Sequence, residues 1–447
     1  METEKKWEEM TWQEKREIRF RKWLDAPGVT FKDEQARQDY RTRVTRYIKT
    51  IKHEEPDRVP VSLPAGYLAA SWAGYNLGQV MYDYDKLADA WLRFNRELQP
   101  DSAFGPGLVY PGRVLEIIGH KLHKWPTHGL GDDVPMYQFV EGMYMQPDEY
   151  DEFKDNPTEY WLHTFLPRTA SAFEGFQHLG RFSPVLTNPL AFVMSASRPE
   201  VRKSLQALLD AAEEIEKWAE AVGRVGRTVL EEGYPSLGGG GMAGAPFDNC
   251  SDVLRGTTGI VQDMFRRPQK IQETMERLVP IIIREAVRGA EKTLSPVVMM
   301  PLHKGEKSFM SPKQFETFYW PTLQKVLVGL VEEGLVPMPF AEGNYEPRLE
   351  HIGDLPKTGV IWYFEVMDMA KAKKMIGDTC TICGNVPASI LVTGTKDQVK
   401  ERCKRLIEDC AAGGGYILNG SAGMNNGPID SLRAMMEAAV EYGTYRK

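Results

Sequence analysis

The sequence predicts an α/β protein built as a (β/α)8 TIM-type barrel, with an N-terminal helical extension and a long insertion after the second strand. From residue 51 onward, short β-branched or apolar runs that end in Gly, Pro or a polar residue alternate with longer amphipathic helices. This alternation is typical of parallel strands joined by crossover helices. The runs number eight, as a closed barrel requires, and they cover 58–64, 102–110, 234–243, 296–305, 335–343, 359–368, 379–387 and 414–423.

The helices between the later runs carry clear start and stop signals. The segment SPKQFETFYWPTLQKVLVGLVEEG opens with a Ser N-cap and a Pro at the first helical position, and it closes with Gly. TKDQVKERCKRLIEDCAAGGG has the same punctuation. An open doubly wound sheet is the alternative architecture, but it needs a nucleotide fingerprint. GGGGMAGAP lacks the G-x-G-x-x-G spacing and reaches Pro246 before any helix begins.

We divide the chain into two parts on this basis. Residues 1–50 place Trp, Arg and Glu at helical spacing without much apolar mass, which predicts surface helices that lean on the main domain. Residues 51–447 form the barrel, and the interval of about 111–233 is an excursion between the second and third strands.

Composition excludes several classes of function. The 447 residues include 42% hydrophobic and 26% charged residues, enough for a large core in an ordinary soluble protein. A net charge of −7 leaves no basic excess for nucleic acid. The charged N-terminus and the absence of an apolar run of about 18 residues predict no signal peptide and no membrane span. Five scattered cysteines fit a reducing compartment, so we expect a cytoplasmic protein.

The candidate catalytic residues follow from the barrel geometry, because the C-terminal ends of all strands surround one mouth. We predict that His303, Glu342 and Glu365 are catalytic, since an imidazole or carboxylate ending an apolar strand is costly unless it is used or paired. Other side chains at the mouth or with aromatic character are predicted to contact the substrate, namely Tyr67, Tyr110, Phe247, Asn344, Tyr345, Asn385 and Asn419.

Each candidate also has a purely structural interpretation. Glu342 could form a salt bridge with Arg348, Glu365 could pair with a Lys or Arg, and His303 could be a solvated loop residue. Cys380 and Cys383 form a C-x-x-C pair, which invites a metal or redox site. On a strand, however, side chains three residues apart point to opposite faces, so we do not expect them to chelate one ion.

Several segments resemble the uroporphyrinogen decarboxylase superfamily. They are PDRVPVSLP, LRGTTGIVQDMFRRPQKI, MSPKQFETFYWPTLQKVL, GNVPASILVTGTKDQVKERCKRLIE and the terminal GGGYILNGSAG with IDSLRAMMEAAVEYG. The resemblance runs from about residue 50 to the end and implies a (β/α)8 fold. True decarboxylases place arginines after the first strand to hold substrate carboxylates, whereas this chain has Ala65, Gly66 and Tyr67 there.

The sequence is more similar to the cobalamin-dependent methyltransferase branch of that superfamily. Its zinc-using members end the fifth strand in His-x-Cys-Gly-Asn and supply a second Cys from the eighth. Here Phe340 and Glu342 stand at the first two ligand positions, and Ser421 or Ala422 at the last, so the thiolate set is absent. Glu342, His303 and Glu365 could bind zinc in its place. Without a metal, Glu342 or Glu365 would act as a general acid.

The resemblance therefore implies an enzyme that moves a methyl group from a small O- or N-methyl compound to a corrinoid on a partner protein. Zinc is an optional second cofactor, and a homodimer is compatible with the sequence. One alternative is porphyrinogen decarboxylation, which requires at least two arginines at the mouth. The other is a non-catalytic barrel that serves as a binding subunit, in which His303, Glu342 and Glu365 would not share one cavity.

Overall fold

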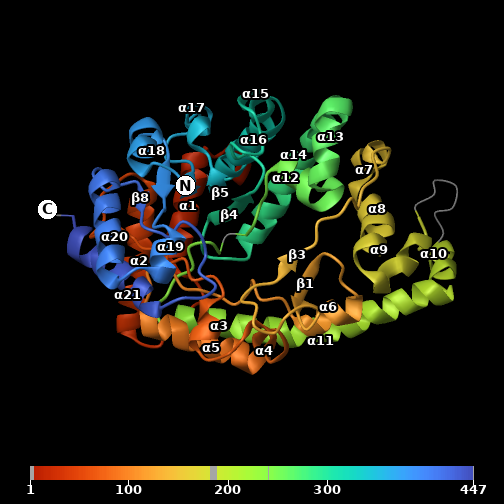
Figure 1. Cartoon of the computed structure of the whole chain (residues 1–447), viewed down its shortest axis with the longest axis horizontal. Helices are drawn as coiled ribbons and strands as arrows, with labels where there is room; N and C mark the ends of the chain where they lie inside the picture. The colour runs from red at the N-terminus through yellow and green to blue at the C-terminus, as the bar shows by residue number, and fades with distance from the viewer. Residues whose placement is uncertain (1–4, 182–188, 240, 446–447) are drawn as a thin grey trace.

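A parallel sheet forms the centre of the molecule. The computed structural model describes residues 5–181, 189–239 and 241–445. Residues 1–4, 182–188, 240 and 446–447 lie outside this description, so the predictions that include them are compared only over the described residues. Five parallel strands are hydrogen-bonded in chain order (Figure 1): β4 (Val297–Leu302), β5 (Val336–Asn344), β6 (Ile361–Val366), β7 (Thr381–Cys383) and β8 (Tyr416–Ile417).

Helices connect these strands, as the alternating pattern predicts. Ser311 and Thr395 cap their helices through their hydroxyls, each within a capping box, so both predicted helix starts are confirmed. The helices that follow β4 to β8 are α15 (Pro312–Gln314), α16 (Trp320–Glu332), α17 (Leu349–Ile352), α18 (Met369–Ile376), α19 (Ala388–Thr393), α20 (Lys396–Cys410) and α21 (Ile429–Tyr442).

The first three predicted strands differ from the prediction, because none of them forms a continuous strand in the residues that the structure describes. Residues 58–64 touch the β8 edge through one parallel bridge, Val61 with Leu418, and residues 234–243 touch β4 through Met242 with Met299. Residues 102–110 form no strand, although the Ala103 amide donates to the Pro235 carbonyl at 2.7 Å. These segments are rich in proline and glycine, which remove ladder donors and weaken extended structure.

The predicted excursion between the second and third segments contains a small sheet and several helices. In the sheet, β1 (His123–Pro126) pairs with β2 (Gly129–Leu130) and β3 (Gln138–Phe139). The long helix α11 (Pro199–Glu231) returns along the body, and α10 (Pro189–Ala196) lies at its far end (Figure 1). The remaining helices of the excursion are α6 (Gly112–Ile118), α7 (Tyr150–Asp155), α8 (Pro157–Tyr160) and α9 (Leu166–Thr169).

Two groups of helices flank the remaining segments. Helices α3 (Leu68–Trp72), α4 (Leu77–Tyr82) and α5 (Tyr84–Leu98) follow the segment 58–64. After residue 243 come α12 (Pro246–Asp248), a π-helical stretch over Asn249–Arg255, α13 (Gly256–Arg266) and α14 (Pro268–Glu291). No helix in the described parts of the chain is both long enough and apolar enough to cross a membrane.

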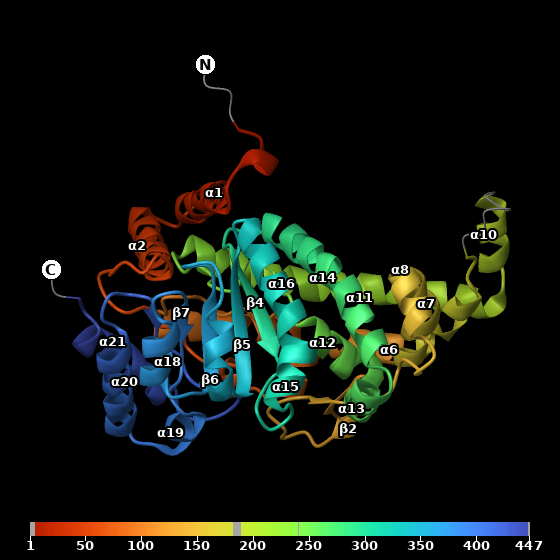
Figure 2. The ribbon, with the colours of Figure 1, turned by 90° about the horizontal axis from the view of Figure 1, so that it is seen from above.

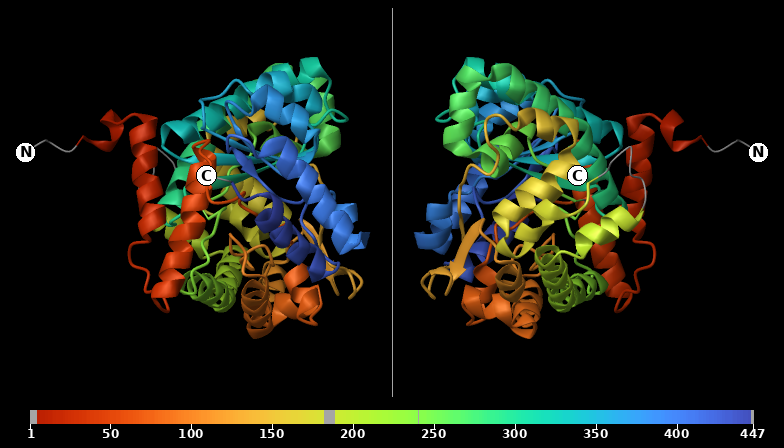
Figure 3. Two further views of the ribbon diagram at one scale, coloured as in Figure 1. Left: turned by 90° about the vertical axis from the view of Figure 1, so that its left-hand side faces the viewer. Right: turned by 90° about the vertical axis from the view of Figure 1, so that its right-hand side faces the viewer.

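The N-terminal helices α1 (Trp12–Asp25) and α2 (Glu34–Ile51) lie at the end where the strands begin (Figures 2 and 3). Phe20, Trp23 and Tyr47 form one buried cluster with the first residues of three strands, Val297, Val336 and Ile361. The Tyr47 hydroxyl donates to the Val61 carbonyl at 3.0 Å. The N-terminal segment therefore contributes to the core at the base of the sheet.

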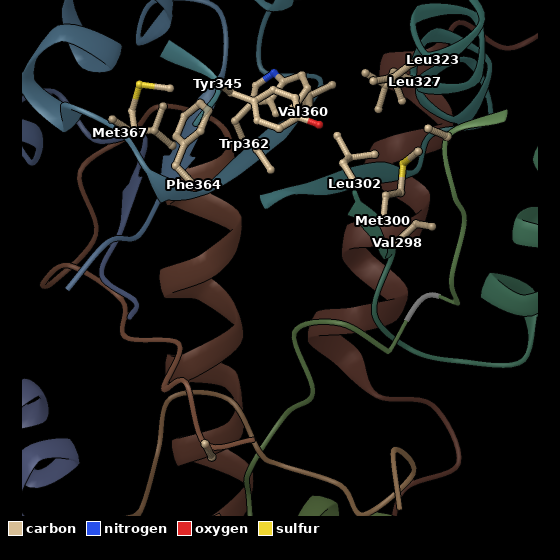
Figure 4. Close-up of a cluster of buried hydrophobic side chains, with 14 of the residues drawn as sticks. Val298, Met300, Leu302, Leu323, Leu327, Tyr345, Val360, Trp362, Phe364 and Met367 are labelled. Atoms are coloured by element: carbon tan, nitrogen blue, oxygen red, sulfur yellow. The ribbon is translucent and has the colours of Figure 1, made fainter. Parts of the chain in front are cut away.

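Side chains alternate between two cores along each strand, because neighbouring residues point to opposite faces. One face of the sheet packs against the surrounding helices (Figure 4), through residues that include Val298, Met300, Leu302, Leu323, Leu327, Trp362 and Phe364. The opposite face packs with α1 and α2, through residues that include Val297, Met338, Tyr363, Cys383 and Ile417.

Candidate functional site

The candidate site lies at the carboxyl ends of β4, β5 and β6, on the face that points away from the surrounding helices. Strand register aligns Pro301, Phe340, Tyr363, Cys383 and Ile417 in one row. His303, Glu342 and Glu365 each follow a member of this row by two residues, which places them on the same face one step nearer the mouth. The three residues predicted to be catalytic are thus brought together by the fold.

His303 is held at both its side chain and its main chain. Its Nδ1 atom lies 2.5 Å from Oδ2 of Asp252, and its Nε2 atom lies 3.8 Å from Oε2 of Glu342. Its main-chain amide donates to Asp248 at 2.9 Å. The Asp252 hydrogen bond is the main cause that raises the pKa of His303 to about 9. The imidazole is therefore positively charged at neutral pH.

Asp248 is a buried carboxylate that organises this loop. It accepts hydrogen bonds from the amides of His303 and Lys304, at 2.9 and 3.1 Å, and from the Tyr319 hydroxyl at 2.7 Å. Burial, reinforced by the negative Asp252, raises the pKa of Asp248 to about 6 in spite of these donors. Asp248 therefore fixes the backbone at the end of β4, whereas Asp252 binds the side chain of His303.

Glu342 and Glu365 form the acidic side of the rim. Burial raises the pKa of Glu342, and the negative charges of Glu365 and Asp252 add to this effect while His303 opposes it. The Glu365 carboxylate accepts a hydrogen bond from the Gly343 amide at 2.6 Å. Gly343 has φ of +80° and a Cβ there would lie 2.9 Å from Glu306, so glycine lets the chain turn directly after Glu342.

Glu342 and Glu365 contact groups other than the Arg and Lys partners of the purely structural interpretation. The Arg348 guanidinium donates to main-chain carbonyls, including that of Gly305 at 3.1 Å, and Glu342 forms its ion pair with His303. Glu365 is satisfied by a main-chain amide. The side chains of His303 and Glu342 are each 41% exposed, so the rim is open to solvent.

The residues of the rim do not fit a metal centre as they stand. Among the described residues, no group of three or more His, Cys, Asp and Glu side chains is arranged to hold a metal ion. Nδ1 of His303 is already bonded to Asp252, and Glu365 is bonded to the main chain. The zinc set of His303, Glu342 and Glu365 expected from the sequence is therefore not formed in this arrangement.

A comparison with models of known protein families identifies the family of this chain. The model of the uroporphyrinogen decarboxylase (URO-D) family matches residues 183–442, which is more than half of the chain. The chain belongs to the URO-D family. Sequence relatives include the uroporphyrinogen decarboxylases of Psychromonas ingrahamii, 23% identical over 226 residues, and of rice chloroplasts (Oryza sativa), 26% identical over 267 residues.

These URO-D matches are partial. They cover 48% and 57% of this chain and 62% and 63% of the two relatives, so the chain spans less than two thirds of either relative. Among solved structures, a methyltransferase from Methanosarcina mazei matches with a TM-score of 0.56 and 18% identity. That match covers 89% of this chain and 98% of the other, and at this identity it establishes a shared fold only.

The predicted substrate residues of this URO-D family member fall into three groups. Phe247 and Tyr345 are fully buried around Tyr319, with the Phe247 and Tyr319 ring centroids 5.8 Å apart, so they support the rim from behind. Asn385 and Asn419 are also buried: Asn385 donates to the Met367 carbonyl at 2.9 Å, and Asn419 accepts from the Gly420 amide at 2.8 Å.

The third group is more accessible. Asn344 follows Glu342 on the same strand, is partly buried and accepts a hydrogen bond from the Glu346 amide at 2.9 Å. Tyr67 and Tyr110 flank Tyr137 of the excursion, at ring-centroid distances of 5.6 and 4.7 Å. Tyr67 follows the first predicted strand and Tyr110 ends the second, and both keep a predicted role in substrate binding.

The C-x-x-C pair behaves as the strand geometry predicts. Cys380 belongs to the core beneath the surrounding helices, and Cys383 belongs to the core on the opposite face of the sheet. Both cysteines are free and buried. The two thiols therefore do not share a ligand site.

The sequence analysis missed Asp248 and Asp252. The signal for them was present, because two aspartates four residues apart follow the glycine-rich third run and lie on one face of a helical segment.

Proposed function

We propose that this URO-D family protein is a cytoplasmic, cobalamin-dependent methyltransferase that moves a methyl group from a small O- or N-methyl compound to a corrinoid on a partner protein. The observation that carries the proposal is the contact between His303 and Glu342 at the open end of the sheet, with Glu365 beside them. An acid and a charged imidazole at one rim are suited to protonate a leaving group.

The proposed mouth depends on a closed barrel. The bridge of Val61 with Leu418 at one edge of the sheet and that of Met242 with Met299 at the other support closure. Between these edges, the segment near Ala103 is hydrogen-bonded to Pro235. We infer that the eight predicted runs form a (β/α)8 barrel in which the first three are irregular, so that the loops after all eight surround the rim.

The chemistry of demethylation requires a proton donor when the substrate is an ether. As the bond between the methyl carbon and the oxygen breaks, its electron pair stays on the oxygen, which must be protonated or stabilised. The corrinoid, when a partner presents it, supplies the electron pair for the new bond to the methyl carbon. Glu342 is assigned as the acid because partial burial raises its pKa while its side chain remains 41% exposed at the rim.

Within this proposal the rim favours O-methyl over quaternary N-methyl substrates. A quaternary ammonium releases a neutral amine, which needs no proton, whereas an ether releases an alkoxide or phenolate. His303 and Lys304 place positive charge beside the acid, which would stabilise such an oxyanion. Tyr67 and Tyr110 are assigned to the apolar part of the substrate.

Porphyrinogen decarboxylation is less well supported. A substrate with many carboxylates needs several free cations, and the segment 58–64 is followed by Ala65, Gly66 and Tyr67. His303 and Lys304, two cations at the rim, both contact Asp252, at 2.5 and 3.5 Å. A non-catalytic barrel is also less well supported, since it predicts that His303, Glu342 and Glu365 are dispersed.

The test uses the full chain purified without chelators, with free cob(I)alamin as the methyl acceptor. We expect methylcobalamin to form with at least one member of a panel of methoxylated aromatics, methanol and methylamines, and no turnover of uroporphyrinogen. Decarboxylation of uroporphyrinogen without any methyl transfer would overturn the proposal. Elemental analysis of the same sample tests the metal-free chemistry, and one zinc per chain, lost together with activity on chelation, would reassign Glu342 as a ligand.

A further inference from the structure

The contact between Asp252 and His303 links two segments that the sequence keeps apart. Asp252 lies in the helical segment Asn249–Arg255, whereas His303 follows β4. The Oδ2 atom of Asp252 is 2.5 Å from Nδ1 of His303, and the Asp252 side chain is only 17% exposed. Charge-assisted hydrogen bonds of this length are among the stronger ones in proteins.

The other oxygen of Asp252 is also bound, which fixes the orientation of the carboxylate. Its Oδ1 accepts a hydrogen bond from the Ser251 hydroxyl at 3.0 Å and lies 3.5 Å from Nζ of Lys304. Lys304 is itself held by Thr257, whose hydroxyl oxygen lies 3.0 Å from Nζ. Asp252 therefore presents a single oxygen to His303, in a direction set by its other partners.

This arrangement determines which ring nitrogen of His303 faces the site. A carboxylate can only accept a hydrogen bond, so Nδ1 must carry a proton. Nε2 is left as the nitrogen directed toward Glu342, 3.8 Å away. Free imidazole side chains can rotate and exchange tautomers, but here Asp252 holds the ring while Asp248 holds the main-chain amide of the same residue at 2.9 Å.

We propose that Asp252 is a positioning residue of the rim, which keeps a proton on Nδ1 of His303 and directs Nε2 toward Glu342 and the reacting group. Its effect on turnover rests on the proposed function, whereas its effect on the imidazole does not. The neighbouring Lys304 is a second partner of Asp252, so a test must separate the loss of the imidazole contact from the loss of the ion pair.

The first measurement reads the tautomer directly. Long-range ¹H–¹⁵N spectra of histidine-labelled protein, recorded at about pH 10 where most of the His303 imidazole is neutral, distinguish Nδ1–H from Nε2–H, and His303→Gln identifies the signal. We expect Nδ1–H in the wild type and in Lys304→Met, and a shift to Nε2–H in Asp252→Ala. An Nε2–H ring in the wild type would overturn the proposal. An Nδ1–H ring in Asp252→Ala would overturn it as well.

The second measurement is the rate of methyl transfer to cob(I)alamin. We expect Asp252→Ala to lower kcat roughly 10- to 100-fold with little change in KM, as loss of an orienting partner does in other sites. Asp252→Asn, which keeps an acceptor oxygen, is expected to recover part of this loss. Glu316→Gln is the matched control, because Glu316 pairs with Nε2 of His351 at 3.2 Å outside the rim, and it should leave kcat unchanged.

The outcomes separate the two hypotheses. If the wild type transfers no methyl group but the tautomer changes as expected, the proposed function fails and the positioning role of Asp252 stands. If methyl transfer occurs and Asp252→Ala retains full kcat, the positioning role fails and the proposed function stands. A KM increase at constant kcat would likewise reject positioning, because it would indicate that Asp252 contributes only to substrate binding.

Discussion

The Nε2 atom of His303 lies 3.8 Å from Oε2 of Glu342, although the two residues end different strands of the sheet. Both side chains are 41% exposed, so this pair faces solvent and not the core. The contact unites an imidazole held by Asp252 with a carboxyl group whose pKa is raised, mainly by burial.

Replacing Glu342 by Gln should abolish most of the activity while the protein stays folded. The amide keeps the size of the side chain but cannot donate the proton, and loss of a general acid costs roughly 10²- to 10⁴-fold in rate. Steady-state kinetics with cob(I)alamin provide the measurement, and Glu350→Gln, on the exposed surface of α17, is the control. Unchanged turnover would remove Glu342 from the mechanism.

The His303–Asp252 pair should make stability depend on pH in a defined direction. The pKa of His303 is raised from 6.5 to about 9 in the folded state, chiefly by the Asp252 hydrogen bond. The stabilisation is therefore complete below about pH 6.5 and is lost as the pH rises through about 9.

Urea unfolding of wild type and Asp252→Asn at about pH 6 and pH 10 tests this direction. We expect the difference in unfolding free energy to be larger at pH 6, by about 1 kcal/mol because the pair is half-exposed. An equal difference at both pH values would show that the pair contributes no pH-dependent stability.

Asp101 should be important for joining helix α2 to the segment 58–64. It is 1% exposed and accepts hydrogen bonds from Arg46 at 2.6 Å, Arg58 at 2.7 Å and the Val61 amide at 2.9 Å. Asp101→Ala removes a buried acceptor from all three donors, of which Arg46 keeps Asp57, and loss of one partner of a buried ion pair typically costs about 3–5 kcal/mol. The free energy of urea unfolding measures this cost.

Asp85→Ala is the matched control, because Asp85 pairs with Arg224 while its side chain is 91% exposed. Surface pairs of this kind contribute about 0–1 kcal/mol. Equal effects of the two substitutions would show that Asp101 has no special role in the core.

The five cysteines should resist alkylation in the folded protein. All of them are free and buried, and burial raises the pKa of Cys250, Cys380, Cys403 and Cys410 to about 12 and that of Cys383 further still. Since only the thiolate reacts, iodoacetamide should label no site in native protein and every site after unfolding. Mass spectrometry of the labelled chains measures this, and rapid native labelling of Cys383 would contradict the position assigned to β7.

The sequence by itself determined the alternating plan of the later strands and helices. The capping signals at Ser311 and Thr395 act through neighbouring residues, and the opposite facing of Cys380 and Cys383 follows from the two-residue period of a strand. The positions of His303, Glu342 and Glu365 at strand ends follow from the same local rules. These properties depend on residues close together in the chain, so pattern alone specifies them.

Only the tertiary structure decided what surrounds these three residues. Asp248 and Asp252 reach His303 from a segment that is separated from it by helices α13 and α14, and Arg348 donates to main-chain carbonyls and not to Glu342. The first three predicted strands became irregular, because proline and glycine left them with few ladder hydrogen bonds. Contacts between distant segments depend on how the whole chain packs, and local pattern carries no information about which partner a buried carboxylate will find.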